Sequence, residues 1–414
     1  MLEKIKKHGI AGSLRIAWEH LVEGANKGVS YLCQRFPIQE NLVVLESEGD
    51  LSDNAYALYA HMHEAGYLKN YKVVWLVDHV AEAKRRVFEN TECVVKSPRS
   101  VKFRRNYALA TCRWYIFDHN NKMANLKKRP EQTLTYLSHG WGYKAAKGGG
   151  ASRERTRPDY LTATGELAAE GLAEYWSEPR EKVRITGYPR IDYFYGDHGH
   201  ARKIAREKWR FDRYRKVIFW MPTFRQSKSA WLSEDYIHNQ TGLSIFETLD
   251  SLRAFSEFLK ENGILLVFKL HHLQAELPVF QETFENIVIL HDEDLYEAGV
   301  QLYEIVALAD GLISDYSSIA IDFMALDRPI VFTLDDYEQY DKSRGLYPKN
   351  AIDFMPGYHV YNVRELEDSV REIADGVDRY KDQRDRVREK YHAYTDGNAA
   401  ERVLQSLGIR NDRA

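Results

Sequence analysis

From residue 41 onward, short apolar segments alternate with segments whose apolar residues recur every three to four positions. The short segments are rich in β-branched and aromatic residues, which is typical of buried strands. The expected strands are NLVVLES (41–47), YKVVWLVD (71–78), RWYIFDH (113–119), TLTYLSHG (133–140), YLTATG (160–165), KVRITGYP (182–189), KVIFWMPTF (216–224), GILLVFKLHH (263–272), NIVILHD (286–292), DGLISDY (310–316) and RPIVFTLDD (328–336). Helical spacing between several of them, for instance over residues 53–65 and 80–89, predicts parallel sheets covered on both faces.

A polar, charged stretch after residue 187 divides these segments into two series, and 414 residues suffice for two cores. We therefore predict an α/β protein with two doubly wound, Rossmann-like domains. The expected units are an amphipathic helix at 1–36, an N-terminal domain at 37–195, a linker at 196–212, a C-terminal domain at 213–385 and a C-terminal helix at 386–414. The last helix is expected to follow TDGN, with Asn398 as its cap and Glu401 three residues on.

The first 36 residues have a composition of their own. Their helical stripe of apolar residues comprises Ile10, Leu14, Trp18, Leu21, Ala25, Val29 and Leu32. Six lysines and arginines outnumber three glutamates, and Arg15 interrupts the apolar run, which argues against a cleaved signal peptide. Two interpretations stay open: the helix lies flat on an anionic membrane, or it packs on its own domain. No segment reaches the roughly twenty apolar residues that a transmembrane helix needs.

Composition excludes several classes of protein. Hydrophobic residues make up 44% of the chain and charged residues 29%, as expected of a folded protein. The net charge of -3 gives no reason to expect nucleic acid as a partner. The three cysteines have no metal-type spacing and fit a reducing, cytoplasmic setting. The HMH and HH pairs lack zinc spacing, and KGGG at 147–150 is no phosphate-binding fingerprint, so no metal site is predicted.

The stretch GLISDYSSIAIDF places a polar turn directly between a buried strand and a helix. Ser317 or Ser318 could simply cap that helix with its hydroxyl. Alternatively, the free backbone N–H groups at the helix start hold a phosphate or diphosphate. Lys269 and His271 end another strand and point to one face of it, because they lie two residues apart. Cationic and hydroxyl groups thus collect where ligands bind in such sheets, and they suit a nucleoside diphosphate.

Seven motifs in order make the chain resemble one enzyme family. They are SHGWGYK, TGYPRIDYF, MPTFRQ, FKLHH, ISDYSSIAIDFMALDRPIVF, DDYEQYDKSRGLY and YTDGNAAERV, spanning residues 138–403. The series is similar to that of the CDP-glycerol glycerophosphotransferases, teichoic-acid and capsule enzymes of the two-domain glycosyltransferase B fold. This resemblance implies transfer of glycerol phosphate, or ribitol phosphate in close relatives, from a CDP-linked donor to a hydroxyl, with release of CMP. It implies a lipid-linked acceptor, carried on a polyprenyl diphosphate.

The resemblance also assigns roles to residues. His139 matches the proposed general base, and Gly140 and Lys144 belong to the same acceptor-side motif, where HGWGYK replaces the more frequent His-Gly-Thr-Pro run. In the C-terminal domain, the expected donor site, His271 is the second expected catalytic residue. It matches a histidine that contacts donor phosphate, where it would stabilise the charge on leaving CMP, although His272 stands where proline is commoner. The remaining donor-binding residues are expected to be Lys269, Ser317, Ser318, Arg225, Arg344 and Asp315. For Asp315, contact with a polyol hydroxyl and capping of the turn both stay open.

The expected chemistry needs no tightly bound cofactor. Mg²⁺ on the donor diphosphate is one alternative, and the helix start with a lysine and a histidine is the other. The expected partners are CDP-glycerol or CDP-ribitol, a polyprenyl-diphosphate-linked glycan and the cytoplasmic face of the cell membrane. The oligomeric state and the choice between wall teichoic acid and capsule are not predicted. The size of the chain favours priming over polymerisation. Two other classes to be tested are a nucleotide-sugar hexosyltransferase of the same fold and a silent binding module.

Overall fold

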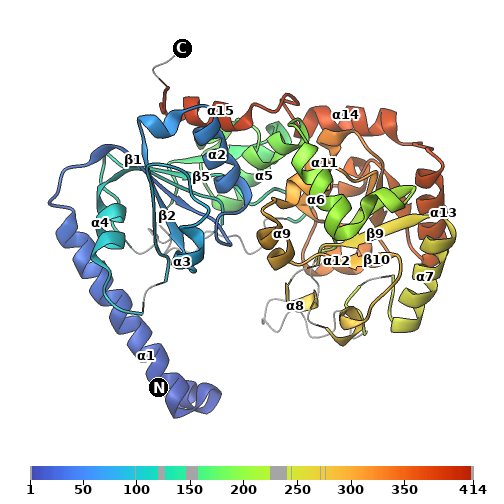
Figure 1. Cartoon of the computed structure of the whole chain (residues 1–414), viewed down its shortest axis with the longest axis horizontal. Helices are drawn as coiled ribbons and strands as arrows, with labels where there is room; N and C mark the ends of the chain where they lie inside the picture. The colour runs from blue at the N-terminus through green and yellow to red at the C-terminus, as the bar shows by residue number, and fades with distance from the viewer. Residues whose placement is uncertain are drawn as a thin grey trace.

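Two parallel sheets organise the protein. Its structure is a computed structural model that describes residues 2–97, 99–119, 126–145, 157–223, 240–243, 245–270, 272–275 and 277–411. The side chains of 2–16, 272 and 273 are not described. The first sheet contains β1 Gln39–Glu46, β2 Lys72–Val77, β3 Thr91–Val95, β4 Cys112–Phe117, β5 Thr133–Tyr136, β6 Tyr160–Ala163 and β7 Val183–Ile185. The second contains β8 Lys216–Trp220, β9 Ile264–Phe268, β10 Ile287–Ile289, β11 Gly311–Ser314, β12 Ile330–Thr333 and β13 Tyr358–Val360. The sheets lie side by side (Figure 1).

The strand order reverses once in each sheet. The orders are β3-β2-β1-β4-β5-β6-β7 and β10-β9-β8-β11-β12-β13, so the reversals fall between β1 and β4 and between β8 and β11. Every neighbouring pair of strands within these sheets is parallel. This confirms the predicted α/β class with parallel sheets, and the two sheets fit two domains. In such sheets the reversal opens a crevice at the carboxyl ends of the strands, where ligands bind.

Helices cover both faces of each sheet, as the helical spacing between the strands predicts. The α-helices are α1 Leu2–Cys33, α2 Asp53–Glu64, α3 Val80–Ala83, α4 Phe103–Thr111, α5 Glu166–Trp176, α6 Gly199–Trp209, α7 Leu249–Glu261, α8 His272–Ala275, α9 Asp292–Ala298, α10 Leu302–Val306, α11 Ser318–Phe323, α12 Tyr337–Ser343, α13 Val363–Ala374, α14 Lys381–Tyr391 and α15 Ala399–Ser406. The 3₁₀-helices are η1 Tyr67–Lys69, η2 Arg180–Lys182, η3 Pro189–Phe194, η4 Phe211–Arg213, η5 Pro278–Gln281, η6 Met324–Leu326 and η7 Ala351–Phe354.

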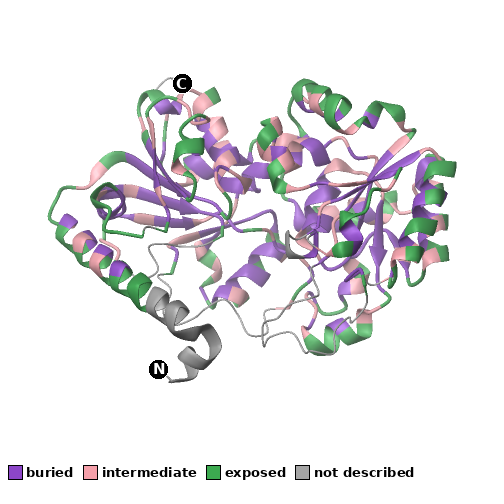
Figure 2. Cartoon of the chain, turned by 60° about the horizontal axis from the view of Figure 1, so that its bottom comes forward, coloured by how far each residue is buried: buried purple, intermediate pink, exposed green. Residues whose placement is uncertain are grey.

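The strands are buried and the outer helix faces are exposed (Figure 2). In the first sheet, α2 and α15 cover one face and α4 covers the other. In the second sheet, α7 and α13 cover the face opposite to α10 and α11. The short edge strands β3 and β13 were not predicted, because polar residues interrupt both TECVV and YHV.

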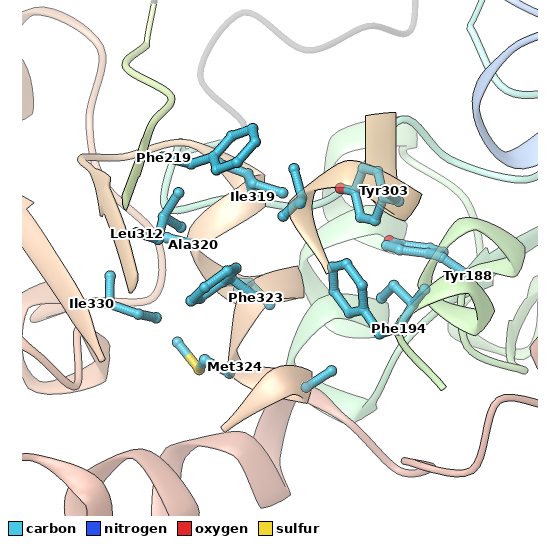
Figure 3. Packing of buried hydrophobic residues seen from close by; sticks show 14 of the residues in the cluster. Tyr188, Phe194, Phe219, Tyr303, Leu312, Ile319, Ala320, Phe323, Met324 and Ile330 are labelled. Atoms are coloured by element: carbon cyan, nitrogen blue, oxygen red, sulfur yellow. The ribbon is translucent and has the colours of Figure 1, made fainter. Parts of the chain in front are cut away.

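One hydrophobic core joins the two halves of the chain. The η3 segment follows the first sheet, and its Phe194 stacks on Tyr303 of α10 with ring centroids 5.2 Å apart. Tyr188 from the first half and Phe323 of α11 belong to the same buried cluster (Figure 3). The halves therefore meet through apolar packing, which fixes the two carboxyl edges relative to each other.

The N-terminal helix packs on α4 with its small and polar side. Val22, Asn26, Ser30 and Cys33 are buried, and the amide Nδ2 of Asn26 donates to the carbonyl of Ser100, 3.2 Å away. The large apolar residues point outward instead: Trp18 is 59% exposed, Leu21 64% and Leu32 59%. The helix therefore packs on its own domain, as one of the two interpretations expects, but Trp18, Leu21 and Leu32 of the predicted apolar stripe take no part in that packing.

The C-terminal region spans both halves. Helix α14 ends at Tyr391, and α15 then packs on the first sheet, where Val403 and Leu404 are buried (Figure 1). Asn398 precedes α15 but makes no side-chain cap, because Asp192 of η3 accepts the N–H groups of Ala399 and Ala400 at 2.9 and 2.8 Å. The helix start is thus capped from a distant segment, which local spacing could not reveal.

Candidate functional site

The candidate site lies at the two strand-order reversals. At the first reversal, Glu48 follows β1 and His119 follows β4, and His139 lies beyond the neighbouring strand β5. At the second, Thr223 follows β8 and the turn 315–318 follows β11. The sequence places the predicted residues correctly at strand ends, and the topology brings them to one edge of each sheet.

His139 is held by a carboxylate from another element. Its Nδ1 lies 3.0 Å from Oδ2 of Asp53, the first residue of α2, and its side chain is 48% exposed. Burial lowers the pKa of His139, but the hydrogen bond and the charge of Asp53 outweigh that effect, so this pKa is raised. The Nδ1–H donates to Asp53 in the neutral imidazole, which leaves Nε2 as the proton acceptor.

A buried ion network continues from Asp53 into the second half of the chain. Nη1 of Arg190 lies 2.8 Å from Oδ1 of Asp53, and its Nη2 lies 2.6 Å from Oδ2 of Asp322 on α11. The hydroxyl of Tyr303 donates to the same Asp322 oxygen at 2.5 Å. Burial alone would raise the pKa of Asp53, but Arg190 and His139 hold that pKa well below its usual range. Asp53 is therefore a carboxylate at neutral pH.

Two further titratable residues surround the outer nitrogen of His139. Glu48 Oε2 lies 3.7 Å from Nε2, and the His119 ring lies edge-on at a centroid distance of 5.1 Å. Single ligand atoms of Glu48, His119 and His139 come within 4.8 Å of one another, close enough to share an ion. All three side chains are exposed, and we assign no metal site to them. Beneath them, burial and the charge of Asp53 raise the pKa of Asp118 well above its usual value.

The loop that carries His139 rests directly on the start of α11. Gly140 adopts a φ of +96°, and a Cβ there would meet Nη2 of Arg190 at 2.5 Å and Oγ of Ser318 at 2.6 Å. A Cβ on Gly142 would lie 2.7 Å from the carbonyl oxygen of Tyr316 and 2.8 Å from the backbone nitrogen of Ser318. Glycine at these two positions lets the base loop of the first half touch the turn of the second.

The same loop continues as a short pairing with the second half. The N–H of Tyr143 donates to the carbonyl of Tyr316 at 3.2 Å, and Lys144 forms an antiparallel bridge with Leu346. Lys144 is exposed, and the half-buried Arg344 lies two residues before its partner. Three motifs that are far apart in sequence, around residues 139, 317 and 344, therefore meet in one place.

Ser317 and Ser318 stand at the start of α11, as its N-cap and its first residue. Ser317 is the N-cap residue, and its side chain makes no capping hydrogen bond. Both serines are half buried. The interpretation that a serine hydroxyl caps this helix is therefore wrong for Ser317, the N-cap. With only six α-helical residues in α11, the local backbone N–H groups matter more here than a helix dipole.

Asp315 is turned into the protein. Its side chain is fully buried, and its oxygens accept the backbone N–H of Thr223 at 2.9 and 3.0 Å and the Thr223 hydroxyl at 2.6 Å. These bonds tie the end of β11 to the end of β8. The geometry favours the capping alternative over contact with a polyol, because no surface of Asp315 is exposed.

Lys269 lies at the end of β9 with its ammonium group 2.9 Å from Oδ1 of Asp292. Its side chain is 11% exposed, and Asp292 begins α9. The predicted donor residues Arg225 and His271 lie outside the described residues. Of the three cationic donor residues predicted at the carboxyl ends of β8 and β9, only Lys269 thus lies within the described residues.

A cavity of about 610 Å³ lies at the opposite, amino-terminal, ends of β8, β11 and β12. Its lining includes Val217, Asp310 and Arg328, which stand at the beginning of these strands. Ligands of doubly wound sheets bind at the other end of the strands, so this cavity does not belong to the candidate site.

Sequence reasoning missed Asp53, Arg190 and Asp322 as parts of the site. Asp53 opens a helix seven residues after β1, Arg190 lies in a short 3₁₀-helix, and Asp322 faces inward from α11. One signal was available: an aspartate and an arginine that follow strands at the carboxyl edge of a doubly wound sheet belong near a ligand. No signal in the sequence paired them with one another.

Two doubly wound parallel sheets, in contact where a histidine loop rests on a serine turn, define a protein with two Rossmann-like halves, and in such folds ligands bind at the carboxyl ends of the strands. The chain belongs to the CDP-glycerol:poly(glycerophosphate) glycerophosphotransferase family, whose sequence model matches residues 29–408. This confirms the resemblance seen in the motifs.

Relatives with named activities cover almost the whole chain. The chain is 26% identical over 403 residues to a teichoic acid ribitol-phosphate primase of Bacillus spizizenii, covering 92% of this chain and 94% of the primase. It is also 26% identical over 390 residues to a teichoic acid glycerol-phosphate transferase of Staphylococcus aureus, covering 89% and 93% of the two chains. Among solved structures, the wall teichoic acid polymerase TagF matches with a TM-score of 0.71, 20% identity and 93% coverage of both chains, which shows a shared fold.

Proposed function

We propose that the protein transfers glycerol phosphate from CDP-glycerol to a hydroxyl of a lipid-linked glycan and releases CMP. The observation that carries this proposal is the contact between the His139 loop and the start of α11, at the reversals of both sheets. This contact joins the loop that carries the proposed proton acceptor to the turn whose backbone N–H groups we propose bind the diphosphate, and transfer of a phosphoryl group to a hydroxyl needs both kinds of group. Membership of the family supports the same reaction class.

In the proposed reaction, Nε2 of His139 takes the proton of the acceptor hydroxyl while its oxygen attacks the phosphorus that carries glycerol. The bond from this phosphorus to the oxygen of CMP breaks, and CMP leaves with the negative charge. Ser317, Ser318 and the N–H groups behind them bind the diphosphate, with Lys269 supplying positive charge nearby. His271, Arg225 and Arg344 stay predicted donor ligands. Mg²⁺ on the diphosphate stays an alternative source of positive charge.

The released nucleotide tests the reaction. Purified protein is incubated with a lipid-linked disaccharide and, in separate reactions, CDP-glycerol, CDP-ribitol or a UDP-sugar, and the nucleotide products and added units are counted. We expect CMP from CDP-glycerol and none in the absence of acceptor. CMP from CDP-ribitol alone would make the protein a ribitolphosphotransferase, consistent with the related primase of that name. Release of UDP alone would overturn the proposal in favour of a hexosyltransferase, and no release in favour of a binding module.

We further propose that α1 brings the enzyme to the cytoplasmic face of the cell membrane. Its exposed Trp18, Leu21 and Leu32 accompany a surplus of positive charge over residues 1–36. Such a surface suits an anionic bilayer, where a lipid-linked acceptor would reside. None of the helices in the described ranges is long and apolar enough to cross a membrane.

Substitution tests this role better than deletion, because Asn26 of α1 supports the loop around Ser100 and Lys102. Replacing Trp18, Leu21 and Leu32 with glutamate should abolish binding to anionic liposomes and leave CDP-glycerol binding unchanged. A control variant carries glutamate at the exposed Tyr361 and Val377 in the second half. Equal liposome binding by the parent and the triple variant would refute the proposal.

A further inference from the structure

The network that begins at His139 crosses from the base to the helix that starts at the proposed donor site. Asp53 contacts His139 with one oxygen and Arg190 with the other, at 3.0 and 2.8 Å. Arg190 then contacts Asp322, at 2.6 Å, four residues after Ser318 on α11. The side chains of Arg190 and Asp322 are 5% and 0% exposed, so solvent hardly screens this part. Exposed ion pairs contribute little, whereas buried pairs such as these depend strongly on both partners.

The backbone around the network is also held in unusual conformations. Asp53 and Ser138 have φ angles of +56° and +66°, in the left-handed region that side chains other than glycine rarely adopt. The side-chain amide of Asn54, next to Asp53, connects the segments of Arg190 and Ser138. Its Oδ1 accepts the N–H of Arg190 at 3.0 Å, and its Nδ2 donates to the carbonyl of Ser138 at 2.9 Å. Such strain persists only where the surroundings impose it, and it is commonest at functional sites.

We propose that Asp53 is a positioning residue that fixes the orientation and tautomer of His139, and that Arg190 and Asp322 hold Asp53 in register with the donor-binding half. The inference rests on the proposed function, in which His139 is the base. Asp53 does not touch the substrate in this role. It keeps the proton on Nδ1, so that Nε2 stays free to accept one from the acceptor hydroxyl. The link through Arg190 makes that arrangement depend on contact between the two halves.

The charges around His139 make the proposal testable through opposite shifts. Asp53 and Glu48 favour its protonated form, whereas Arg190 disfavours it. The other groups at this edge are Asp118 and His119, and Lys96 acts on His119. Asp53→Asn removes a negative charge and should lower the pKa of His139, and Arg190→Gln removes a positive charge and should raise it. Because the base acts when deprotonated, the acid limb of the pH–rate profile should move down in Asp53→Asn and up in Arg190→Gln.

The measurement combines NMR titration of ¹⁵N-histidine-labelled full-length protein with kinetics at saturating acceptor. His139 is assigned by the signal lost in His139→Gln. We expect Asp53→Asn to lower kcat on the order of 10²-fold with KM for CDP-glycerol changed by less than about threefold. Arg190→Lys keeps the charge and should leave the pKa of His139 near the parent value. Asp322→Asn should lower kcat severalfold without moving that pKa, because the charges nearest to His139 remain.

Each outcome supports or overturns one part of the inference. An unchanged His139 pKa in Asp53→Asn, or shifts of the same sign in Asp53→Asn and Arg190→Gln, would overturn it. If Arg190→Gln does not fold, Asp53→Asn and Arg190→Lys still test the inference. The pKa of His139 should fall in Asp53→Asn, which loses a charge, and stay near the parent value in Arg190→Lys, which keeps one. The titration needs no turnover. If the variants show these pKa shifts but the parent protein releases no CMP, the proposed function is contradicted and the positioning of His139 by Asp53 stands.

Discussion

The carboxyl edges of the two sheets share a topology and differ in chemistry. Both strand orders reverse beside the first strand of the sheet, between β1 and β4 and between β8 and β11. The first edge presents groups that change charge, with His139 and its partner Asp53 at the centre. The second presents the hydroxyls of Ser317 and Ser318, with the carboxylate of Asp315 turned inward. The fold thus supplies two equivalent positions. Their loops carry different groups, which we propose act as a proton acceptor at the first edge and as an anion site at the second.

The largest expected effect comes from removing the proton acceptor of the first edge. His139→Ala should lower CMP release on the order of 10²–10⁴-fold and leave CDP-glycerol affinity nearly unchanged, because the base acts in the transition state. His119→Ala is the matched control, since its ring lies 5.1 Å away at the same edge and has no proposed role. His271→Ala should lower donor affinity as well as rate. Calorimetry and CMP release together separate these outcomes, and a His139→Ala enzyme that keeps most of its turnover would contradict the assignment.

Much of the contrast could be predicted from the sequence, because strand ends are local features. The apolar runs end at Ser314 and near Ser138, and the next residues carry the polar chemistry. What could not be predicted is which side chains turn inward. Asp315 and His139 follow their strands in the same way, yet one is fully buried and the other half exposed. Their hydrogen-bond partners, Thr223 for Asp315 and Asp53 for His139, come from distant segments.

The second prediction concerns the buried carboxylate of the second edge. Thr223→Val removes the hydroxyl that donates to Asp315 at 2.6 Å and should destabilise the protein by about 1.5–3 kcal/mol, the usual range for bonds to a charged group. Thr333→Val is the control, because its hydroxyl makes only a neutral bond of 3.3 Å to the carbonyl of Ser314 and should cost less. Urea unfolding measures both. Unchanged stability together with weaker CDP-glycerol binding would mean that Asp315 faces the donor after all.

A third prediction tests whether the two edges must touch. Gly142→Ala places a Cβ 2.7 Å from the carbonyl oxygen of Tyr316, and backbone atoms cannot move aside cheaply. We expect a loss of about 1–3 kcal/mol in stability and a fall in CMP release, since the His139 loop is pushed off α11. Gly24→Ala in α1 is the matched control, because nothing lies within 4 Å of its added Cβ. That variant should be neutral or slightly stabilising. Full activity of Gly142→Ala would show that the close approach is dispensable.

The contact between the two edges was the part of the site that the sequence predicted least. The motifs around His139, Ser317 and Arg344 appear in order along the chain, but nothing in their spacing says that they meet. Their meeting depends on Gly140 and Gly142, and on the pairing of Lys144 with Leu346. Local propensity sets elements, whereas packing between elements sets which loops touch.

The smallest expected effect concerns the hydroxyls of the second edge. Ser317, the N-cap residue of α11, makes no side-chain capping bond, and both serines are half buried. Replacing their hydroxyls should therefore cost little in stability. If they bind the diphosphate, replacing Ser317 and Ser318 with alanine should weaken CDP-glycerol binding by about 1–2 kcal/mol, since the backbone N–H groups remain. Ser369→Ala is the control, because it removes a hydroxyl from α13 on the other face of the same sheet. Calorimetry gives the affinities, and CMP release at saturating donor should stay within severalfold of the parent. Unchanged affinity in the double variant would assign anion binding to the backbone alone. The second edge would then act through backbone N–H groups, whereas the first acts through the side chain of His139.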